Sequence, residues 1–141
     1  MSEKIKFVYQ IDEDSPFEIE SLWADKIGEY YQIDNIPFFA KNIAVGDIVS
    51  IEEDGGELFF DALVQASGHS VVRVLFNDAH QIKSFGEQII KLGCSWEGNH
   101  IKTLISIDIP KNVDYSIVRN FLEEGENRGK WEYQEACIAH N

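Results

Sequence analysis

Hydrophobic residues in the second half of the chain recur with two different periods. At 79–92 and again after Asp114 they return every three or four residues, which predicts two amphipathic helices. At 101–109 an isoleucine or a threonine occupies every second position, which predicts a strand that Pro110 ends. Shorter apolar runs predict three more strands, at 71–76, 94–97 and 131–139. The resulting order, β-α-β-β-α-β, is the split βαβ, ferredoxin-like pattern.

The first half shows no helical period. Alternation of apolar and more polar residues over 5–11 predicts a half-buried strand. The pair Gly55-Gly56 after Asp54 predicts a hairpin, because both glycines tolerate positive φ. Four further runs predict strands, at 17–26, 29–36, 45–51 and 57–66. Several short strands without a helix are typical of a small antiparallel barrel or a curled sheet.

These patterns predict an α+β protein made of two parts. An acidic antiparallel β subdomain, a sheet or small barrel over residues 1–68, precedes a ferredoxin-like subdomain over residues 69–141. No linker rich in Pro, Gly or Ser separates the two parts, and we therefore expect them to pack as one unit.

Six short segments stand out in order between residues 18 and 139. They are Glu20–Ala24, Tyr31–Ala40, Val45–Asp47, Ser67–Ser70, Leu92–Cys94 and Trp131–Ala136. Taken together, these segments resemble a bacterial domain-of-unknown-function family, number 4265. The resemblance implies that both halves form one evolutionary unit. It implies no reaction, because that family has no assigned activity.

Charge is distributed unequally between the two halves. Residues 1–70 hold fifteen Asp and Glu against four Lys, whereas residues 71–141 hold ten acids against eight Lys and Arg. Nucleic-acid binding is disfavoured, because proteins contact phosphates chiefly through Lys and Arg. A field of this sign attracts basic proteins instead.

The acidic half predicts a protein-binding role. Small acidic bacterial proteins that lack catalytic motifs are often immunity proteins, which neutralise toxins whose nucleic-acid sites are rich in Lys and Arg. We therefore expect an inhibitor of a basic toxin, such as a nuclease, with Trp23 and Phe59 as candidate aromatic anchors. The competing interpretation is that the charge only confers solubility. The candidate contacts lie in two acidic segments: Asp12, Glu13, Asp14, Glu52, Glu53, Asp54 and Glu57.

An alternative function is the binding of a small regulatory molecule. Its natural site would be an aromatic pocket between the two halves, and this is an argument by analogy with other ferredoxin-like domains. The candidate lining residues are Trp23, Phe38, Phe39 and Trp131. Aromatic residues that follow a proline, as in Pro37-Phe38-Phe39, are more often part of a core.

Enzymatic activity is not expected. The sequence contains candidates for a nucleophile, a base and an acid, namely Ser67, His69, Ser70, Cys94 and Asp108. No nucleophile elbow or similar signature frames them, and His69 is more simply a turn histidine bonded to the backbone. The other three histidines, His80, His100 and His140, are expected to face solvent.

No metal or cofactor is expected either. The cysteines Cys94 and Cys137 lack the close partners of a zinc site, and no glycine-rich phosphate loop is present. The chain shows neither a signal peptide nor an apolar run of membrane-spanning length, so the predicted location is the cytoplasm and the cysteines are predicted to be free thiols. Dimerisation through an edge strand of the C-terminal sheet stays open.

Overall fold

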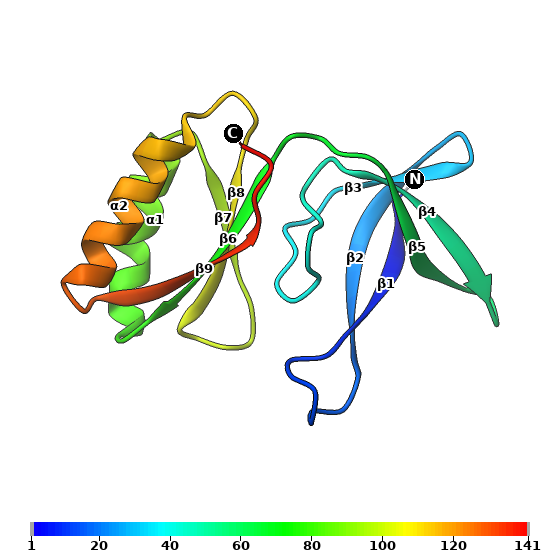
Figure 1. Cartoon of the computed structure of the whole chain (residues 1–141), viewed down its shortest axis with the longest axis horizontal. Helices are drawn as coiled ribbons and strands as arrows, with labels where there is room; N and C mark the ends of the chain where they lie inside the picture. Colours follow the sequence, from blue (N-terminus) through cyan, green and yellow to red (C-terminus); the bar gives the residue numbers. More distant parts are fainter. Residues whose placement is uncertain (1, 141) are drawn as a thin grey trace. The chain divides into compact units, whose positions relative to one another are not determined.

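The structure, a computed structural model, describes residues 2–140. The chain divides into two compact units, with the division between Ser67 and Gly68 (Figure 1). Residues 2–140 contain nine strands and two α-helices, which is a mixed α and β architecture. The expectation that the two parts pack as one unit stays a prediction.

The first unit consists of five strands in one sheet. Neighbouring strands pair antiparallel in chain order, and a parallel pairing of the first strand with the last, at Ile5 opposite Leu58, closes the ring. The strands are β1 (Ser2–Tyr9), β2 (Glu18–Ile27), β3 (Tyr30–Ile33), β4 (Ile48–Asp54) and β5 (Glu57–Gln65).

Alternation along these strands separates a buried face from an exposed one. Ile5 and Phe7 of β1 and Leu22 of β2 point into the core of this unit, whereas the residues between them point outward. The predicted hairpin is confirmed, because Gly55 and Gly56 between β4 and β5 adopt φ values of 61° and 83°.

The predicted strand at 29–36 is shorter than expected, because β3 ends at Ile33. The next residue, Asp34, donates its backbone N–H to the carbonyl of Trp23 at 2.8 Å. From there to Asp47 the chain forms an irregular loop that is nevertheless largely buried.

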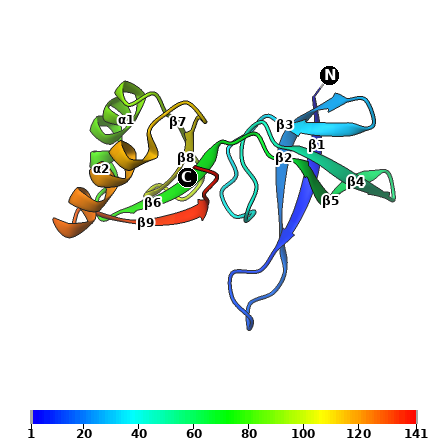
Figure 2. The same cartoon turned by 45° about the horizontal axis from the view of Figure 1, so that its top comes forward.

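The second unit has the predicted element order. Its sheet runs β7-β8-β6-β9 with every pairing antiparallel, and both helices lie on the same side of it (Figure 2). A short 3₁₀ turn, Ala79–Gln81, precedes the first helix. The elements are β6 (Ser70–Phe76), α1 (Ile82–Lys91), β7 (Ser95–Gly98), β8 (Leu104–Ile109), α2 (Tyr115–Asn127) and β9 (Trp131–Cys137).

The strand predicted at 101–109 is also shorter, because β8 begins only at Leu104. The Asn99 side chain accepts the backbone N–H of Ile101 at 2.8 Å, and the carbonyl of Ile101 accepts the N–H of Leu104. These bonds form a turn where the residue types suggested a strand. From Ile105 to Ile109 the predicted alternation into the core is confirmed.

None of the helices in residues 2–140 is both long enough and apolar enough to cross a membrane.

Trp131 at the start of β9 forms the centre of the aromatic core of the second unit. Its ring lies 4.8 Å from Phe85 and 5.7 Å from Phe76, and its indole N–H donates to the carbonyl of Leu122 at 2.9 Å. The ring lies flush against α2 at Gly125, where an added Cβ would come within 1.8 Å of it. The absence of a side chain at this position therefore permits the packing of α2.

Replacing Gly125 with alanine should destabilise the protein. Helix propensity alone would favour alanine by about 1 kcal/mol, but overpacking against Trp131 should cost more, for a net loss of about 2 kcal/mol. Denaturant unfolding of Gly125→Ala against wild type measures this difference, and Asn120→Ala, an exposed position of the same helix, is the matched control. A Gly125→Ala variant more stable than wild type would contradict the described packing.

Candidate functional site

The seven acidic residues selected from the sequence lie in two separate groups. Asp12, Glu13 and Asp14 lie in the loop between β1 and β2, and the others lie in the β4–β5 hairpin. Figures 1 and 2 both show this loop and the hairpin tip well apart. The register explains the separation, because the hairpin pairs with β1 near Lys6 while the loop follows the far end of that strand, about 10 Å further on.

The β1–β2 loop has a defined conformation. One carboxylate oxygen of Asp12 accepts the backbone N–H of Asp14 at 3.0 Å and the hydroxyl of Ser15 at 2.9 Å, and these bonds lower the pKa of Asp12. The side-chain amide of Gln10 donates to the carbonyl of Ser15 at 2.7 Å. Asp12 therefore orders the loop, and the carboxylates of Glu13 and Asp14 are exposed to solvent.

The β4–β5 hairpin concentrates negative charge at its tip. Asp54 and Glu57 lie directly opposite each other in the register, and like charges in that arrangement repel. Lys6 offsets part of this charge through an ion pair of 2.5 Å with Glu57. Burial, and then the carboxylates of Glu3 and Glu53, raise the pKa of Tyr31, so the negative field extends onto the sheet.

Two acidic residues of the first unit are structural. Glu20 accepts three consecutive backbone N–H groups, from Phe38 at 2.8 Å, Phe39 at 3.0 Å and Ala40 at 2.8 Å. Its two oxygens thus bind the peptide backbone of the loop after β3, and this carboxylate is not available to a partner.

Asp47 is the second structural carboxylate and is buried. One of its oxygens accepts the N–H of Ala44 at 3.0 Å and the other accepts the N–H of Ser67 at 2.8 Å. The Ser67 hydroxyl in turn donates to the carbonyl of Val45 at 2.7 Å. The irregular loop is therefore fastened at its start by Glu20 and at its end by Asp47.

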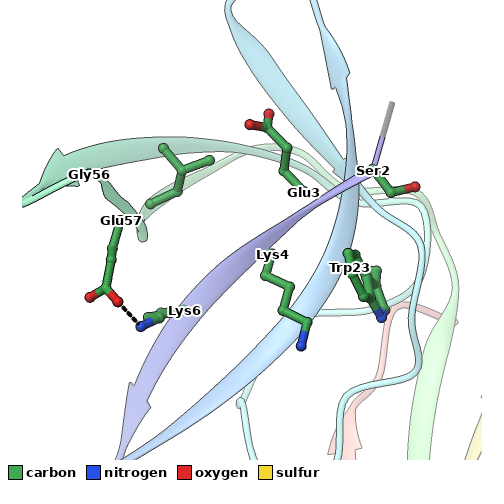
Figure 3. Close-up of a pocket in the computed structure, with 8 residues that line it drawn as sticks. Ser2, Glu3, Lys4, Lys6, Trp23, Gly56 and Glu57 are labelled. Carbon is green, nitrogen blue, oxygen red and sulfur yellow. Dashed lines mark hydrogen bonds and ion pairs between the residues drawn. The ribbon is translucent and has the colours of Figure 1, made fainter.

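A shallow cavity of about 390 Å³ lies on the outer face of β1 and β2, beside the hairpin tip (Figure 3). The Lys4 ammonium lies 4.9 Å from the centre of the Trp23 ring, a cation–π contact between directly paired residues. Lys6 and Glu57 form the opposite side of the cavity. Two of the four lysines in residues 1–70 line this cavity, so the first unit is not uniformly acidic.

The four residues of the predicted aromatic pocket have different surroundings. Trp23 lies on the outer face of β2, 46% exposed, whereas Phe38 is buried and Phe39 stacks on Tyr9 at 5.0 Å. Trp131 belongs to the core of the second unit and is 7% exposed. A ligand pocket formed by all four residues stays a prediction. Phe59, the other candidate anchor, is half-buried in β5.

Within the second unit, the structure brings together members of the candidate catalytic set. His69 Nδ1 lies 2.8 Å from a carboxylate oxygen of the buried Asp108, which is how an acid orients a catalytic base. The candidate nucleophiles are poor, however. Burial, and then the nearby Asp108 carboxylate, raise the pKa of the Cys94 thiol to about 11, so it stays protonated at neutral pH.

Ser70 is fully buried, and the proton and both lone pairs of its hydroxyl take part in hydrogen bonds. Its hydroxyl accepts the backbone N–H groups of Ala139 and His140 and lies 2.6 Å from His140 Nδ1. His140 Nε2 lies 2.8 Å from the carbonyl of Pro110, so that nitrogen carries the proton and Nδ1 accepts from Ser70. The expectation that His140 faces solvent was therefore wrong, because Ala139 and His140 are bonded to Ser70 of the sheet. His80 and His100 are exposed, as expected.

Within residues 2–140, no three His, Cys, Asp or Glu side chains are placed to hold a metal ion.

Comparison with known proteins connects this geometry to a family. The model of a family described as a domain of unknown function, DUF4265, matches residues 20–133. The chain belongs to this family. The match confirms the resemblance noted from the six sequence segments. No curated protein matches the chain.

A solved structure similar to this DUF4265 chain is titled "Novel crystal structure of a hypothetical protein from Neisseria gonorrhoeae". The two chains are 30% identical with a TM-score of 0.88, and the match covers 100% of this chain and 98% of the other.

The segments that carry the DUF4265 resemblance in the first unit are those joined by the two structural carboxylates. Glu20 connects its own segment to Pro37–Ala40, and Asp47 connects the Val45–Asp47 segment to Ser67. These motifs therefore have a structural explanation in hydrogen bonding. Sequence reasoning missed both carboxylates, although the Gly46-Asp47 turn was a partial signal.

Replacing Glu20 with alanine should unfold the loop after β3 or destabilise the whole first unit. Three backbone N–H groups lose their acceptor, and hydrogen bonds to a charged group contribute about 1.5–3 kcal/mol each when not shared with water, so we expect a loss of at least about 3 kcal/mol. The matched control is Glu52→Ala, an exposed strand position of the same unit, which should change the stability by less than about 0.5 kcal/mol. Equal unfolding midpoints for the two variants would contradict the role of Glu20.

Alkylation of Cys94 should be slow at moderately alkaline pH. Near pH 8, a pKa of about 11 leaves about 0.1% thiolate, roughly 100-fold less than a thiol of pKa 9 would have. Mass spectrometry of a Cys137→Ser variant treated with iodoacetamide should show this difference between the native chain and the chain unfolded in urea. The native rate should rise about tenfold per pH unit until the pH approaches the pKa. Equal rates in both states would restore Cys94 as a candidate nucleophile.

Proposed function

We propose that the chain is a non-enzymatic protein-binding domain, and specifically an immunity-type inhibitor that neutralises a basic bacterial toxin such as a nuclease. The observation that carries the proposal is the exposure of the acidic loops. Among the seven candidate contacts, only Glu57 forms an ion pair with a lysine or arginine of residues 2–140. An uncompensated field of this kind accelerates encounter with a basic partner and selects against acidic ones.

In the part of the chain that the structure describes, two of the candidate nucleophiles are not activated, and this supports the non-enzymatic part of the proposal. The His69–Asp108 pair has the geometry of a base and its orienting acid, but the Cys94 thiol is held protonated and the Ser70 hydroxyl is buried and fully bonded. The cytoplasm, where disulfide bonds are rare, is the proposed location.

We also propose a fold name for each unit. The order β9-β6-β8-β7 with antiparallel pairing, and with two helices on one side, favours a ferredoxin-like second unit. The closed pairing of five strands favours a small barrel for the first unit. Neither name by itself implies the inhibitory function.

A small-molecule site is the second candidate function, and one observation favours it. The cavity in Figure 3 places the half-exposed Trp23 ring beside Lys4 and Lys6, and its volume of about 390 Å³ is in the range of ligand pockets. It lies on the first unit alone, so it differs from the four-residue pocket expected from the sequence. A ligand that changes the fluorescence of Trp23 would favour this function if substitutions in the acidic loops leave its affinity unchanged.

Charge reversal should separate the inhibitor from a merely soluble acidic protein. Capture from the host organism, or co-expression with the product of an adjacent gene, should yield a partner with an isoelectric point above about 9. Glu13→Lys/Asp14→Lys and Glu52→Lys/Glu53→Lys should each be compared with Glu87→Lys/Glu132→Lys, which changes the net charge equally in the second unit. We expect at least one of the first two variants to weaken binding about tenfold or more, and the control to weaken it less than about threefold.

Equal affinities for all three variants would leave only a non-specific effect of net charge and would contradict the proposal. Recovery of no basic partner under either condition would contradict it as well.

A further inference from the structure

Large exposed hydrophobic side chains gather at one end of the β1–β2 ribbon. Val8 and Ile19 lie directly opposite each other in the register, 57% and 53% exposed, while Ile11 and Phe17 next to them are 64% and 71% exposed. Single exposed hydrophobics are ordinary on a protein surface, but a cluster within twelve residues of one hairpin marks an interaction site. We call these four residues and the loop between them the ribbon end.

The fold itself holds these side chains outward. On the inner face of the same strands, Tyr9 stacks on Phe39 at 5.0 Å and Glu20 binds three backbone N–H groups of the loop after β3. Since successive strand residues point to opposite faces, Val8 and Ile19 must point away from these contacts. Turning them inward would require a register shift that breaks the inner contacts.

The loop of the ribbon end is already ordered. The bonds of Asp12 to Asp14 and Ser15, and of Gln10 to Ser15, fix it without a partner. A surface ordered before binding loses less conformational entropy on association, which favours a docking element over a flexible tether.

Charge identifies the kind of occupant. From Val8 to Ile19 the chain holds four acidic residues, one of them the loop-ordering Asp12, and no Lys or Arg. An anionic membrane and a second copy of this ribbon end would both be repelled, whereas a protein surface rimmed by Lys and Arg would be attracted. Apolar side chains bordered by acids therefore match an apolar pocket bordered by basic residues.

We propose that the ribbon end, and not the β4–β5 hairpin, is the element that docks into the basic partner, with Phe17 and Ile11 as apolar anchors and Glu13 and Asp14 as its charged rim. This inference rests on the proposed function and names its contact surface. The hairpin lacks comparable anchors, because Leu58 and the other large side chains near its tip are half-buried.

Site-specific photocrosslinking in the host organism tests the proposal. A benzoylphenylalanine replaces Phe17 in the full chain, and the matched control positions are Glu52 in the hairpin and Ile27 at the other end of β2. We expect an adduct from position 17 with a protein of isoelectric point above about 9, and none from position 27. The adduct should be lost in the Glu13→Gln/Asp14→Asn variant, which keeps Asp12 to order the loop. When the crosslinking is repeated in a lysate of the host, the adduct should also be lost at about 0.5 M salt.

Affinity measurements with the purified crosslinked protein complete the test. Phe17→Ala should weaken binding about 10- to 100-fold and Ile27→Ala less than about twofold, with both variants showing the wild-type unfolding midpoint. Equal effects of the two substitutions would overturn the assignment of Phe17 as an anchor.

The outcomes separate this inference from the proposed function. A basic protein crosslinked from position 52 and not from 17 overturns the ribbon end while the inhibitor function stands. An adduct from position 17 with lipid, with another copy of the chain or with an acidic protein overturns the choice of occupant. No basic adduct from any position contradicts both proposals.

Discussion

The first unit depends on one kind of interaction, a carboxylate that binds backbone N–H groups. The chain from Asp34 to Asp47 forms no helix or strand, yet it is largely buried, and buried backbone groups must be hydrogen-bonded. Glu20 supplies acceptors for three of them and Asp47 for one more, with a second bond from Asp47 to Ser67. Without these two side chains, water would have to enter the loop to solvate its N–H groups, and the core residues Ala40 and Ile43 would be exposed with it.

This constraint also determines which residues of the β1–β2 ribbon are exposed. Glu20 must face the loop, so its neighbours Ile19 and Ser21 face away, and the antiparallel register extends the same choice to Val8 in β1. The requirement on the inner face therefore determines that Val8 and Ile19 lie on the outer one. Its exposure has a free-energy cost relative to a polar ribbon, since apolar surface in water is unfavourable by about 25 cal/mol per Å². A fold that keeps such a surface next to an ordered acidic loop is consistent with selection for binding.

Local periodicity predicted much of the architecture and little of the candidate site. The Gly55-Gly56 hairpin and the inward alternation of Ile105 to Ile109 depend on near neighbours in the sequence, and both are confirmed. The loop after β3, and the attachment of His140 to Ser70, depend on side chains 18 to 70 residues away in sequence, which no local period records. The acidic residues could be identified as charged, but their division into two groups depends on the parallel pairing of β1 with β5. That pairing follows from closure of the sheet, and no local residue pattern predicts it.

The net charge of the first unit is consequently a poor measure of its binding surface. Of its fifteen acids, Glu20 and Asp47 are bound to backbone and Glu57 is paired with a lysine, so their charge is largely satisfied within the unit. The field that the proposed partner would meet is set by the few carboxylates that have no such contact and no nearby cation. Around the hairpin, Lys4 and Lys6 oppose them, whereas the ribbon end from Val8 to Ile19 contains no Lys or Arg. Screening over a Debye length of about 8 Å makes this local difference decisive, because charges further away contribute little at physiological salt. The exposed hydrophobic cluster therefore adjoins carboxylates that no Lys or Arg of the ribbon end opposes, and an interface that needs both an apolar centre and a charged rim finds them together there.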